Sequence, residues 1–435
     1  MLQVACSKRS LLPAREVCLH GYGARNYRSN KVEDPVELSC MALAQGKQRW
    51  LIFTIDCIGM DRLDCAQAYK KIAQACDVGF PNILICCSHT HFAPAAENIG
   101  VTVPGGEMEL GIYRGDQEFL DSLLQNMQEA AEEALASLRN ASVEYVVIPL
   151  PAVAFNRRTI NKSDKLVSTN YTYPKNPDEY HFQNWDDNMS VWRFRHEDET
   201  LAILTRFSCH PVTGGSLGSE YISGDYPYHF RRSVEELFGC PAFFMLGAAG
   251  DVVPMQRQGQ SRQDLGEIMA RSIRLNERRF RKIADFSLQA EYVTLPMRLR
   301  LEVDRKGFQL EYEELLKQAR QSETLMPEFV TASSDMLQLL RYPENEVELP
   351  LQIVKFGDHV LVAMPFECLS SIGRKLQAQV DNAILVSISG GYQGYLPLQE
   401  EYAQLGYECS RNHFKPDAGD RFVAAAVAKI KELGF

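Results

Sequence analysis

Two short histidine-containing runs, each directly after an apolar run, most constrain how this chain can fold. Ser-His-Thr-His at 88–91 follows the apolar run 83–87, and Ser-Cys-His-Pro at 208–211 follows the strand-like stretch 201–207. Short apolar runs that end in polar residues are typical of buried strands. Histidine is the commonest protein ligand for metals, and a strand end can aim an imidazole into a cleft. The two runs therefore predict a metal site at strand ends.

Strand-like and helix-like stretches alternate along the chain, which predicts an α/β fold with a mixed β-sheet core, flanking helices and an active site at the C-terminal ends of strands. Gly357-Asp358 between two apolar runs predicts a hairpin, so the sheet is not purely parallel. The expected strands are 51–55, 83–87, 189–194, 201–207, 242–246, 351–356, 359–363 and 384–388. The expected helices are 62–77, 116–139, 226–238, 264–283, 308–321, 368–380 and 420–433.

The organisation of the chain favours one catalytic domain over residues 1–435. It has no internal repeat and no Pro/Ser-rich linker, and the candidate site residues are spread from 89 to 407. The stretch 159–185 is rich in Asn, Asp, Pro, Tyr and Ser, with weak periodicity. This composition predicts a long surface loop.

Charge and cysteine usage exclude some classes of protein. A net charge of -10 argues against a nucleic-acid-binding or anionic-membrane surface. No apolar run approaches the roughly 18 residues of a transmembrane helix, and the first residues lack a signal-peptide pattern. The 12 cysteines include no Cys-x-x-Cys pair, as expected of free thiols in a reducing cytoplasm. We therefore expect a cytoplasmic protein with a small-molecule partner; the oligomeric state stays open.

Five expected strand ends carry polar residues, and three of them carry histidine or glutamate. His89 and His91 follow one, His210 follows another, and Glu367 follows the stretch 359–363. Residues at i and i+2 of an extended segment face the same way, so His89 and His91 can share one site. Two histidines and a carboxylate form a known catalytic zinc set, in which the metal lowers the pKa of water towards about 7. Each residue also has an ordinary alternative: a structural histidine, or a carboxylate in the first turn of a helix.

Nine blocks of the chain carry a family resemblance by their order and spacing. They are Gly-Tyr-Gly-Ala-Arg (21–25), Phe-Thr-Ile-Asp-Cys-Ile-Gly-Met (53–60), Ser-His-Thr-His-Phe-Ala-Pro (88–94), Asn-Arg (156–157), Ser-Gly-Asp (223–225), Gly-Asp-Val (250–252), Phe-Glu (366–367), Tyr-Gln-Gly-Tyr (392–395), and Glu-Glu-Tyr with Tyr-Glu (400–408). Together they resemble the N-terminal catalytic domain of the neutral/alkaline (non-lysosomal) ceramidase family.

The resemblance implies a zinc-dependent hydrolase that cleaves an amide (N-acyl) bond, or less readily an ester, with metal-activated water. The zinc ligands that it implies are His89, His210, Glu367 and Tyr395. The catalytic residues that it implies around the scissile group are His91, Arg157, Tyr407 and Glu367, the last as acceptor of the proton from water.

Two departures from the family favour a substrate other than ceramide. Val253 stands where the family has a serine thought to act at the substrate, and a valine cannot donate a hydrogen bond. Ser88, Ser216 or a water are candidates for that role. The chain also ends at Phe435 without the C-terminal sandwich domain of family ceramidases. We therefore expect a small-molecule or N-acyl substrate.

Two other classes remain open. One is a metal-independent glycosidase that pairs Glu367 with Asp225 or Asp251. The other is a non-catalytic binder of the same fold, suggested by Val253. Asp225 and Asp251 have two further interpretations, since they can hold the N–H groups of ligating histidines or simply form turns.

Overall fold

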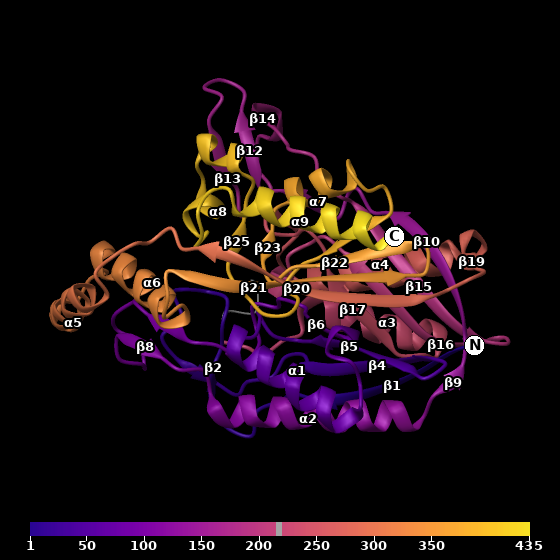
Figure 1. Ribbon diagram of the computed structural model, residues 1–435. Coiled ribbons are helices and arrows are strands. Elements are labelled where there is room, and N and C mark those ends of the chain that lie inside the picture. The colour runs from indigo at the N-terminus through magenta and orange to yellow at the C-terminus, as the bar shows by residue number, and fades with distance from the viewer. Residues whose placement is uncertain (215–219) are drawn as a thin grey trace.

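The computed structural model describes residues 1–214 and 220–435, and its main elements are three β-sheets with helices on their outer faces (Figure 1). The first sheet has the strand order β6-β5-β4-β1-β9. Its strands are β1 (Leu2–Ser10), β4 (Glu37–Gln45), β5 (Gln48–Ile55), β6 (Ile83–Cys87) and β9 (Arg139–Asn140).

The other two sheets have the orders β17-β16-β15-β10-β19 and β20-β21-β22-β24. The second contains β10 (Ser142–Pro149), β15 (Asn188–His196), β16 (Glu199–Phe207), β17 (Ala242–Leu246) and β19 (Arg281–Ile283). The third contains β20 (Leu288–Arg298), β21 (Glu346–Phe356), β22 (His359–Ala363) and β24 (Ala383–Val386).

Each sheet contains one parallel strand pair, and a helix lies between the two strands of that pair in sequence. The pairs are β5 with β6, β16 with β17, and β22 with β24. The helices are α1 (Arg62–Cys76), α3 (Asp225–Phe238) and α7 (Ser370–Gln377). The other pairs are antiparallel, including the hairpin β21–β22 that turns at Gly357, whose φ is 65°. The expected mixed α/β architecture is confirmed. The core strands form three large sheets, where one mixed sheet was expected.

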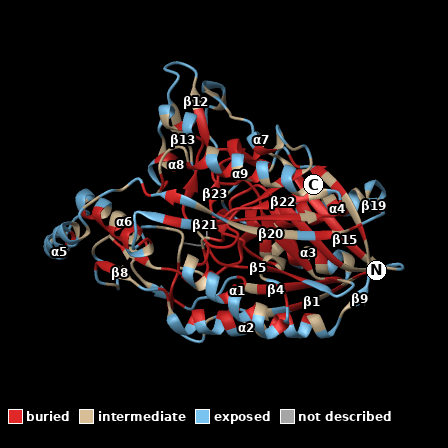
Figure 2. Cartoon of the chain, in the orientation of Figure 1, coloured by how far each residue is buried: buried red, intermediate tan, exposed pale blue. Residues whose placement is uncertain are grey.

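The inner faces of the three sheets share one apolar core. Trp50 from the first sheet, Trp192 from the second and Phe356 from the third belong to the same buried cluster. The rings of Trp192 and Phe356 lie 5.5 Å apart, edge to face. Figure 2 shows these strands buried and the outer helical surfaces exposed. Burial of both sheet faces explains why the strands read as continuous apolar runs.

Helices cover the outer faces. The pair α1 and α2 (Gln117–Ala136) packs on the first sheet, at the bottom of Figure 1. In the same way α3 packs on β17, and α4 (Ser261–Leu275) packs on α3. At the top of the figure, α7 and α9 (Ala418–Leu433) cover the third sheet. The side chain of Asp116 caps α2 by accepting the N–H of Phe119, as expected where an apolar helical stripe begins.

The helices expected over 116–139 and 368–380 extend beyond α2 and α7, and the one expected over 264–283 extends furthest beyond the observed helix. The structure ends α4 at Leu275, so the helix expected over 264–283 is wrong beyond that point. A 3-10 turn over Glu277–Arg279 follows, and Arg281–Ile283 form β19, which pairs with β10. Helix-favouring charged residues are overridden because Ile283 joins the core between the sheets. Conversely, α6 (Pro327–Arg341), which projects with α5 (Arg305–Gln321), is not among the expected helices.

The stretch 159–185 is more regular than the expected loop. Strands β12 (Arg158–Asn161), β13 (Val167–Thr169) and β14 (Tyr180–His181) form a small antiparallel sheet that projects at the top of Figure 1. Backbone pairing, which needs no apolar periodicity, holds it together, and its side chains are mostly half-buried or exposed. Its base carries Arg157 and Arg158 into the interior.

All 12 cysteines are free thiols, and 11 of them are buried. Burial raises the pKa of thiols such as Cys86, to about 12, so they pack as small apolar groups, as expected. None of the helices within 1–214 and 220–435 combines the length and the apolar character needed to cross a bilayer.

A buried carboxyl makes the stability of this fold depend on pH. Glu401, in the 3-10 helix η5 (Gln399–Gln404), accepts hydrogen bonds at Oε2 from Leu398 N and Ser371 Oγ. Burial and the Asp251 carboxylate raise its pKa to about 7. A raised carboxyl pKa means that the stabilisation is complete below the unfolded pKa of about 4.3 and is lost as pH rises through 7.

We therefore expect Glu401→Gln to raise the free energy of unfolding at pH 8 by up to about 3 kcal/mol and to leave it unchanged near pH 4. Glutamine keeps the oxygen that both donors use and removes the ionisation. Urea unfolding at the two pH values measures the effect, with the exposed neighbour Glu400→Gln as control. An equal gain at both pH values would contradict the assignment.

Candidate metal centre

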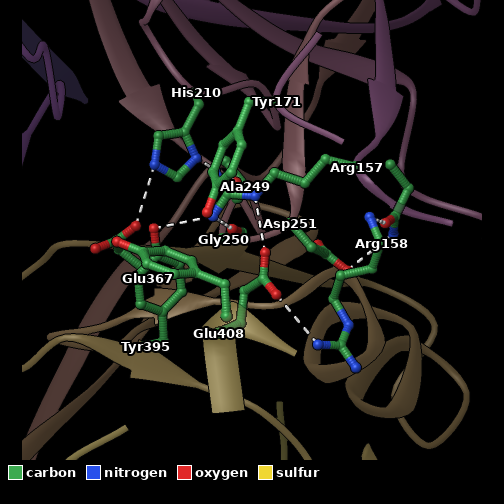
Figure 3. Close-up of polar contacts among 12 residues, drawn as sticks. Arg157, Arg158, Tyr171, His210, Ala249, Gly250, Asp251, Glu367, Tyr395 and Glu408 are labelled. Carbon is green, nitrogen blue, oxygen red and sulfur yellow. Dashed lines mark hydrogen bonds and ion pairs between the residues drawn. The ribbon is translucent and has the colours of Figure 1, made fainter. Parts of the chain in front are cut away.

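Three side chains, each following a strand of a different one of the three sheets, meet in one buried cluster. Nε2 of His89 lies 3.1 Å from Nε2 of His210, and Oε2 of Glu367 lies 3.2 Å and 3.1 Å from these two nitrogens. His89 follows β6, His210 follows β16, and Glu367 follows β22 at the start of β23 (Glu367–Cys368). Figure 3 shows His210 pointing at the Glu367 carboxylate. The sequence prediction that these three meet agrees with these distances.

The hydrogen bonds on the far side of each ring turn its Nε2 towards the centre of this cluster. Nδ1 of His89 lies 2.6 Å from the carbonyl oxygen of Ile58, and Nδ1 of His210 lies 2.6 Å from that of Ala249. A carbonyl only accepts, so each Nδ1 carries a hydrogen, and in a neutral ring Nε2 then presents a lone pair. Burial lowers the pKa of His210 to about 4, which keeps its ring neutral. Glu367 Oε2 has no hydrogen-bond donor among the described residues.

When both rings are neutral, the cluster holds three acceptors within about 3 Å of one another, and these repel one another. A cation removes that repulsion, and the donor set of two imidazole nitrogens and one carboxylate oxygen is one that zinc accepts. The residues therefore fit a divalent metal ion. The carbonyl groups of Ile58 and Ala249 provide the outer hydrogen bonds that ligating histidines usually make.

A left-handed backbone residue, not strand alternation, brings the histidines of the 88–91 run together. His89 has φ 68°, a conformation that costs energy for a residue with a Cβ. Its N–H donates to the carbonyl of Cys57 at 2.9 Å, which fixes the turn. At Gly21, with φ 121°, a Cβ would lie 2.6 Å from His91 Cγ. The glycine-rich run 21–25 therefore gives room to the His91 ring.

His91 faces the same space with unused nitrogens. The ligating atoms of His89, His91 and His210 all lie within 4.8 Å of one another. Neither ring nitrogen of His91 has a hydrogen-bond partner in the described part of the chain. Burial, together with the nearby histidines, holds the pKa of His91 well below its usual value. A neutral imidazole with free nitrogens can bind an ion or a polar group of a substrate.

A short parallel strand pair sets Tyr395 beside Glu367. In the pairing of β23 with β25 (Tyr395–Leu396), Glu367 and Tyr395 are opposite each other. Burial and the Glu367 carboxylate raise the pKa of Tyr395 well above its usual value. Tyr392 donates its hydroxyl hydrogen to Glu367 Oε1 at 2.6 Å, so the carboxylate is oriented with Oε2 towards the histidines. At Gly59 a Cβ would lie 2.4 Å from Tyr392 Cβ.

Arg157 lies next to the cluster, and hydrogen bonds from two of its guanidinium nitrogens hold it in place. It donates from Nε to Glu408 Oε1 at 2.8 Å and from one terminal nitrogen to Tyr395 Oη at 3.0 Å (Figure 3). The other Glu408 oxygen accepts from Arg158 at 3.1 Å. The Tyr407 ring lies 5.6 Å from the Tyr395 ring, and the Arg157 guanidinium lies 5.7 Å from the Tyr407 ring. Arg157 and Tyr407 are therefore close to the cluster, as predicted.

The two candidate aspartates are used elsewhere. Asp251 accepts from the Ser370 N–H at 2.7 Å and from the side chain of Asn156 at 2.8 Å. Asp225 accepts from Gly214 N at 3.0 Å and from the Thr213 hydroxyl. Both are buried, and burial raises the pKa of each. They hold loops in place, and the histidine N–H groups go to backbone carbonyls instead.

The position of the missing serine is apolar. Val253 is buried in a cluster with Phe155 and Val212, and it pairs with Phe155 between β18 (Val252–Pro254) and β11 (Ala154–Asn156). Ser88 is buried, and its oxygen accepts from the Thr90 N–H at 3.4 Å. Ser216 lies outside the described residues.

A cavity of 280 Å³ opens beside the cluster. One part of its wall carries the polar groups of His89, His91, Glu367, Tyr392, Tyr395 and Tyr407. Another part is formed by Leu19, by Ile99 of β7 (Ile99–Val101) and by the α6 side chains Val330 and Leu337. The candidate centre is therefore accessible from a pocket that has both polar and apolar walls.

Comparison with known proteins identifies the fold that carries this cluster. No protein-family profile and no curated protein sequence matches the chain. Among solved structures, the neutral ceramidase from Pseudomonas aeruginosa aligns with a TM-score of 0.71 and 16% identity over 99% of this chain and 75% of that one. A ceramidase complexed with C2 aligns with a TM-score of 0.73 and 15% identity, with the same coverage. The chain has the neutral ceramidase fold. The family resemblance in the nine blocks is thus matched by the fold of the chain.

Several residues around the centre of this ceramidase fold were not singled out by the sequence analysis. Tyr392 and Glu408 stand inside blocks that resemble the family, so their position in the motif was the available signal. Arg158 has only its neighbour Arg157 as a hint, yet its side chain is fully buried. The carbonyls of Ile58 and Ala249 have no sequence signal, because every residue has a carbonyl.

Proposed function

We propose that this protein is a zinc-dependent hydrolase that cleaves the amide bond of an N-acyl compound. The observation that carries the proposal is the meeting of two imidazole Nε2 atoms and one carboxylate oxygen within about 3 Å, with each Nδ1 bound to a backbone carbonyl. The fold gives independent support, because the two solved structures compared above are of ceramidases, and a ceramidase hydrolyses an amide bond.

In this proposal His89, His210 and Glu367 hold the ion, and Tyr395 completes the set. When bound, a divalent ion supplies a Lewis acid that polarises a carbonyl and lowers the pKa of water. Tyr392 keeps Glu367 in its orientation. Arg157 holds the Tyr395 hydroxyl in place through the contact at 3.0 Å.

The remaining groups act on the substrate. Water attacks the carbonyl carbon, the C–N bond breaks, and the leaving nitrogen takes a proton. His91, with two unused nitrogens beside the cluster, is placed to bind the carbonyl oxygen or to pass a proton to that nitrogen. Tyr407 lines the same wall and can donate a hydrogen bond to the substrate. Since these residues come from 89 to 407, we propose that residues 1–435 work as one catalytic unit.

Metal removal tests the proposal. Purified protein is expected to contain about one zinc per chain and to hydrolyse members of a panel of short N-acyl amides. A chelator is expected to abolish both, and added zinc to restore both. Elemental analysis and product release measure the two quantities on the same samples.

Other outcomes identify the competing functions. Undiminished turnover in protein freed of metal would contradict the proposal and favour a carboxylate pair. That alternative needs a second free carboxylate, whereas Asp225 and Asp251 are both engaged in hydrogen bonds. Stoichiometric ligand binding without turnover across amides and esters would favour a non-catalytic binder.

A further inference from the structure

The walls of the cavity beyond the metal centre carry more positive than negative charge. Among the described residues that line it, the charged side chains other than histidines are Arg25, Arg341, Arg411 and Glu367. The single carboxylate, Glu367, faces the two ligating histidines. A cavity with this balance concentrates anions.

The three arginines are not equivalent. Arg341 is paired with Glu97, which is buried behind it and also contacts His20 Nδ1 at 3.0 Å. Arg25 is buried and donates to the carbonyl oxygens of His20 and His91, so its guanidinium supports the backbone of the site. The guanidinium groups of Arg341 and Arg25 are thus engaged by protein groups and are less available to bind a ligand.

Of these three arginines, Arg411 is the one that is exposed and has no ion pair with a described residue. Its guanidinium donates to Ser334 Oγ of α6 at 3.1 Å and lies 5.5 Å from the centre of the Tyr407 ring. No carboxylate of the described ranges forms an ion pair with it. Its acidic neighbour Asp335, whose pKa is raised by burial, is shared with Arg300. The guanidinium fork therefore keeps free N–H groups at the cavity wall.

The chain of contacts from Arg411 leads back to the metal centre. Tyr407, on which the guanidinium lies, has its ring 5.6 Å from Tyr395, which is opposite Glu367 in the β23–β25 pair. His413, which also lines the cavity, carries no charge at neutral pH, since burial and nearby arginines lower its pKa to about 3. On the part of the cavity wall formed by Tyr407, Arg411 and His413, the positive charge thus comes from Arg411.

We propose that the substrate is a small N-acyl amino acid, whose carboxylate is bound by Arg411. This inference rests on the proposed hydrolase function and adds the substrate class. The acyl group would lie against Leu19, Ile99 and Leu337, and the amide at His91 and Glu367. A cavity of 280 Å³ is just below the roughly 300–1,000 Å³ of ligand pockets, so it suits a small substrate. Water adds across the amide: the C–N bond breaks, a C–O bond forms, and the amine nitrogen takes the proton.

The test compares matched pairs of substrates, short-chain N-acyl glycines and the corresponding neutral N-acyl glycinamides. Wild-type protein is expected to prefer the anion. Arg411→Gln is expected to raise KM for the anion by about 10- to 100-fold, the value of a hydrogen bond to a charged group, with kcat and the kinetics of the neutral amide little changed. Arg411→Lys is expected to recover part of the loss. Arg271→Gln, an exposed arginine of α4 paired only with Glu267, is the matched control.

Calorimetric titration of N-acyl glycine, with zinc content measured on the same samples, separates failure of this inference from failure of the proposed function. Binding that weakens in Arg411→Gln, without turnover in the wild type, would support the subsite and contradict the hydrolase. Turnover with equal preference for anion and amide, unchanged in Arg411→Gln, would overturn the subsite and leave the hydrolase standing. Absence of both binding and turnover of the anion in zinc-loaded wild type would also overturn the subsite.

Discussion

His210→Ala is expected to reduce zinc content from about one per chain to near zero and hydrolysis by about 1,000-fold or more. The mutation removes one of the three acceptors that meet within about 3 Å, and a bound divalent ion contributes several kcal/mol to transition-state stabilisation. Elemental analysis and kcat/KM on the same preparation measure both effects. Glu367→Gln is expected to behave alike, since a neutral amide is a weaker ligand than a carboxylate.

The matched control is His181→Ala, an exposed histidine of β14 in the projecting sheet. It is expected to keep full zinc content and activity. Stoichiometric zinc in both His210→Ala and Glu367→Gln would show that the ion, if present, lies elsewhere, and would contradict the proposed centre.

Glu408→Ala is expected to lower the free energy of unfolding by about 3–5 kcal/mol, because it leaves two buried guanidinium groups without a counter-charge. Glu408 and Arg158 are fully buried, and Arg157 is nearly so. Urea unfolding measures the loss as a lower midpoint at unchanged m-value. Glu408→Gln, which keeps the shape and one acceptor, is expected to lose less stability. Activity is expected to fall in both, since Arg157 positions Tyr395.

An exposed ion pair provides the comparison. Glu199 pairs with Arg139 at 2.6 Å on the surface, so Glu199→Ala removes the same kind of contact in water. Exposed pairs contribute little, and we expect almost no change in the urea midpoint. Similar midpoints for Glu199→Ala and Glu408→Ala would contradict the importance assigned to burial.

The sequence predicted strands more reliably where both sheet faces are covered. Ile83–Cys87 and Ala242–Leu246 are fully buried, and both were readable as apolar runs. The run Leu2–Ser10 mixes buried, half-buried and exposed residues, so β1 gave no comparable signal. Strand β19 could not be found from Arg281-Lys282-Ile283 because its pairing partner, β10, is far away in sequence. Pairing over such separations is decided by tertiary contacts.

The candidate site, like the fold, has parts that the sequence predicted and parts that it missed. The structure brings His89, His210 and Glu367 together at the ends of apolar strands, where the sequence placed each of them, and the family resemblance named them as one set. The local reason predicted for His89 and His91 was wrong, since a left-handed residue is invisible without a glycine to mark it. The Glu408 pair with Arg157 and Arg158 was missed because a sequence separation of about 250 residues hides such a contact.

The three proposed ligands follow strands of three different sheets, and this has a consequence for folding as well as for catalysis. An ion held by His89, His210 and Glu367 would cross-link the three sheets at their strand ends. Such an ion would bind the folded chain more tightly than the unfolded one, so its free energy of binding would add to the stability of the whole molecule. Scarcity of metal would then deplete the folded protein itself, and cellular abundance would follow metal supply.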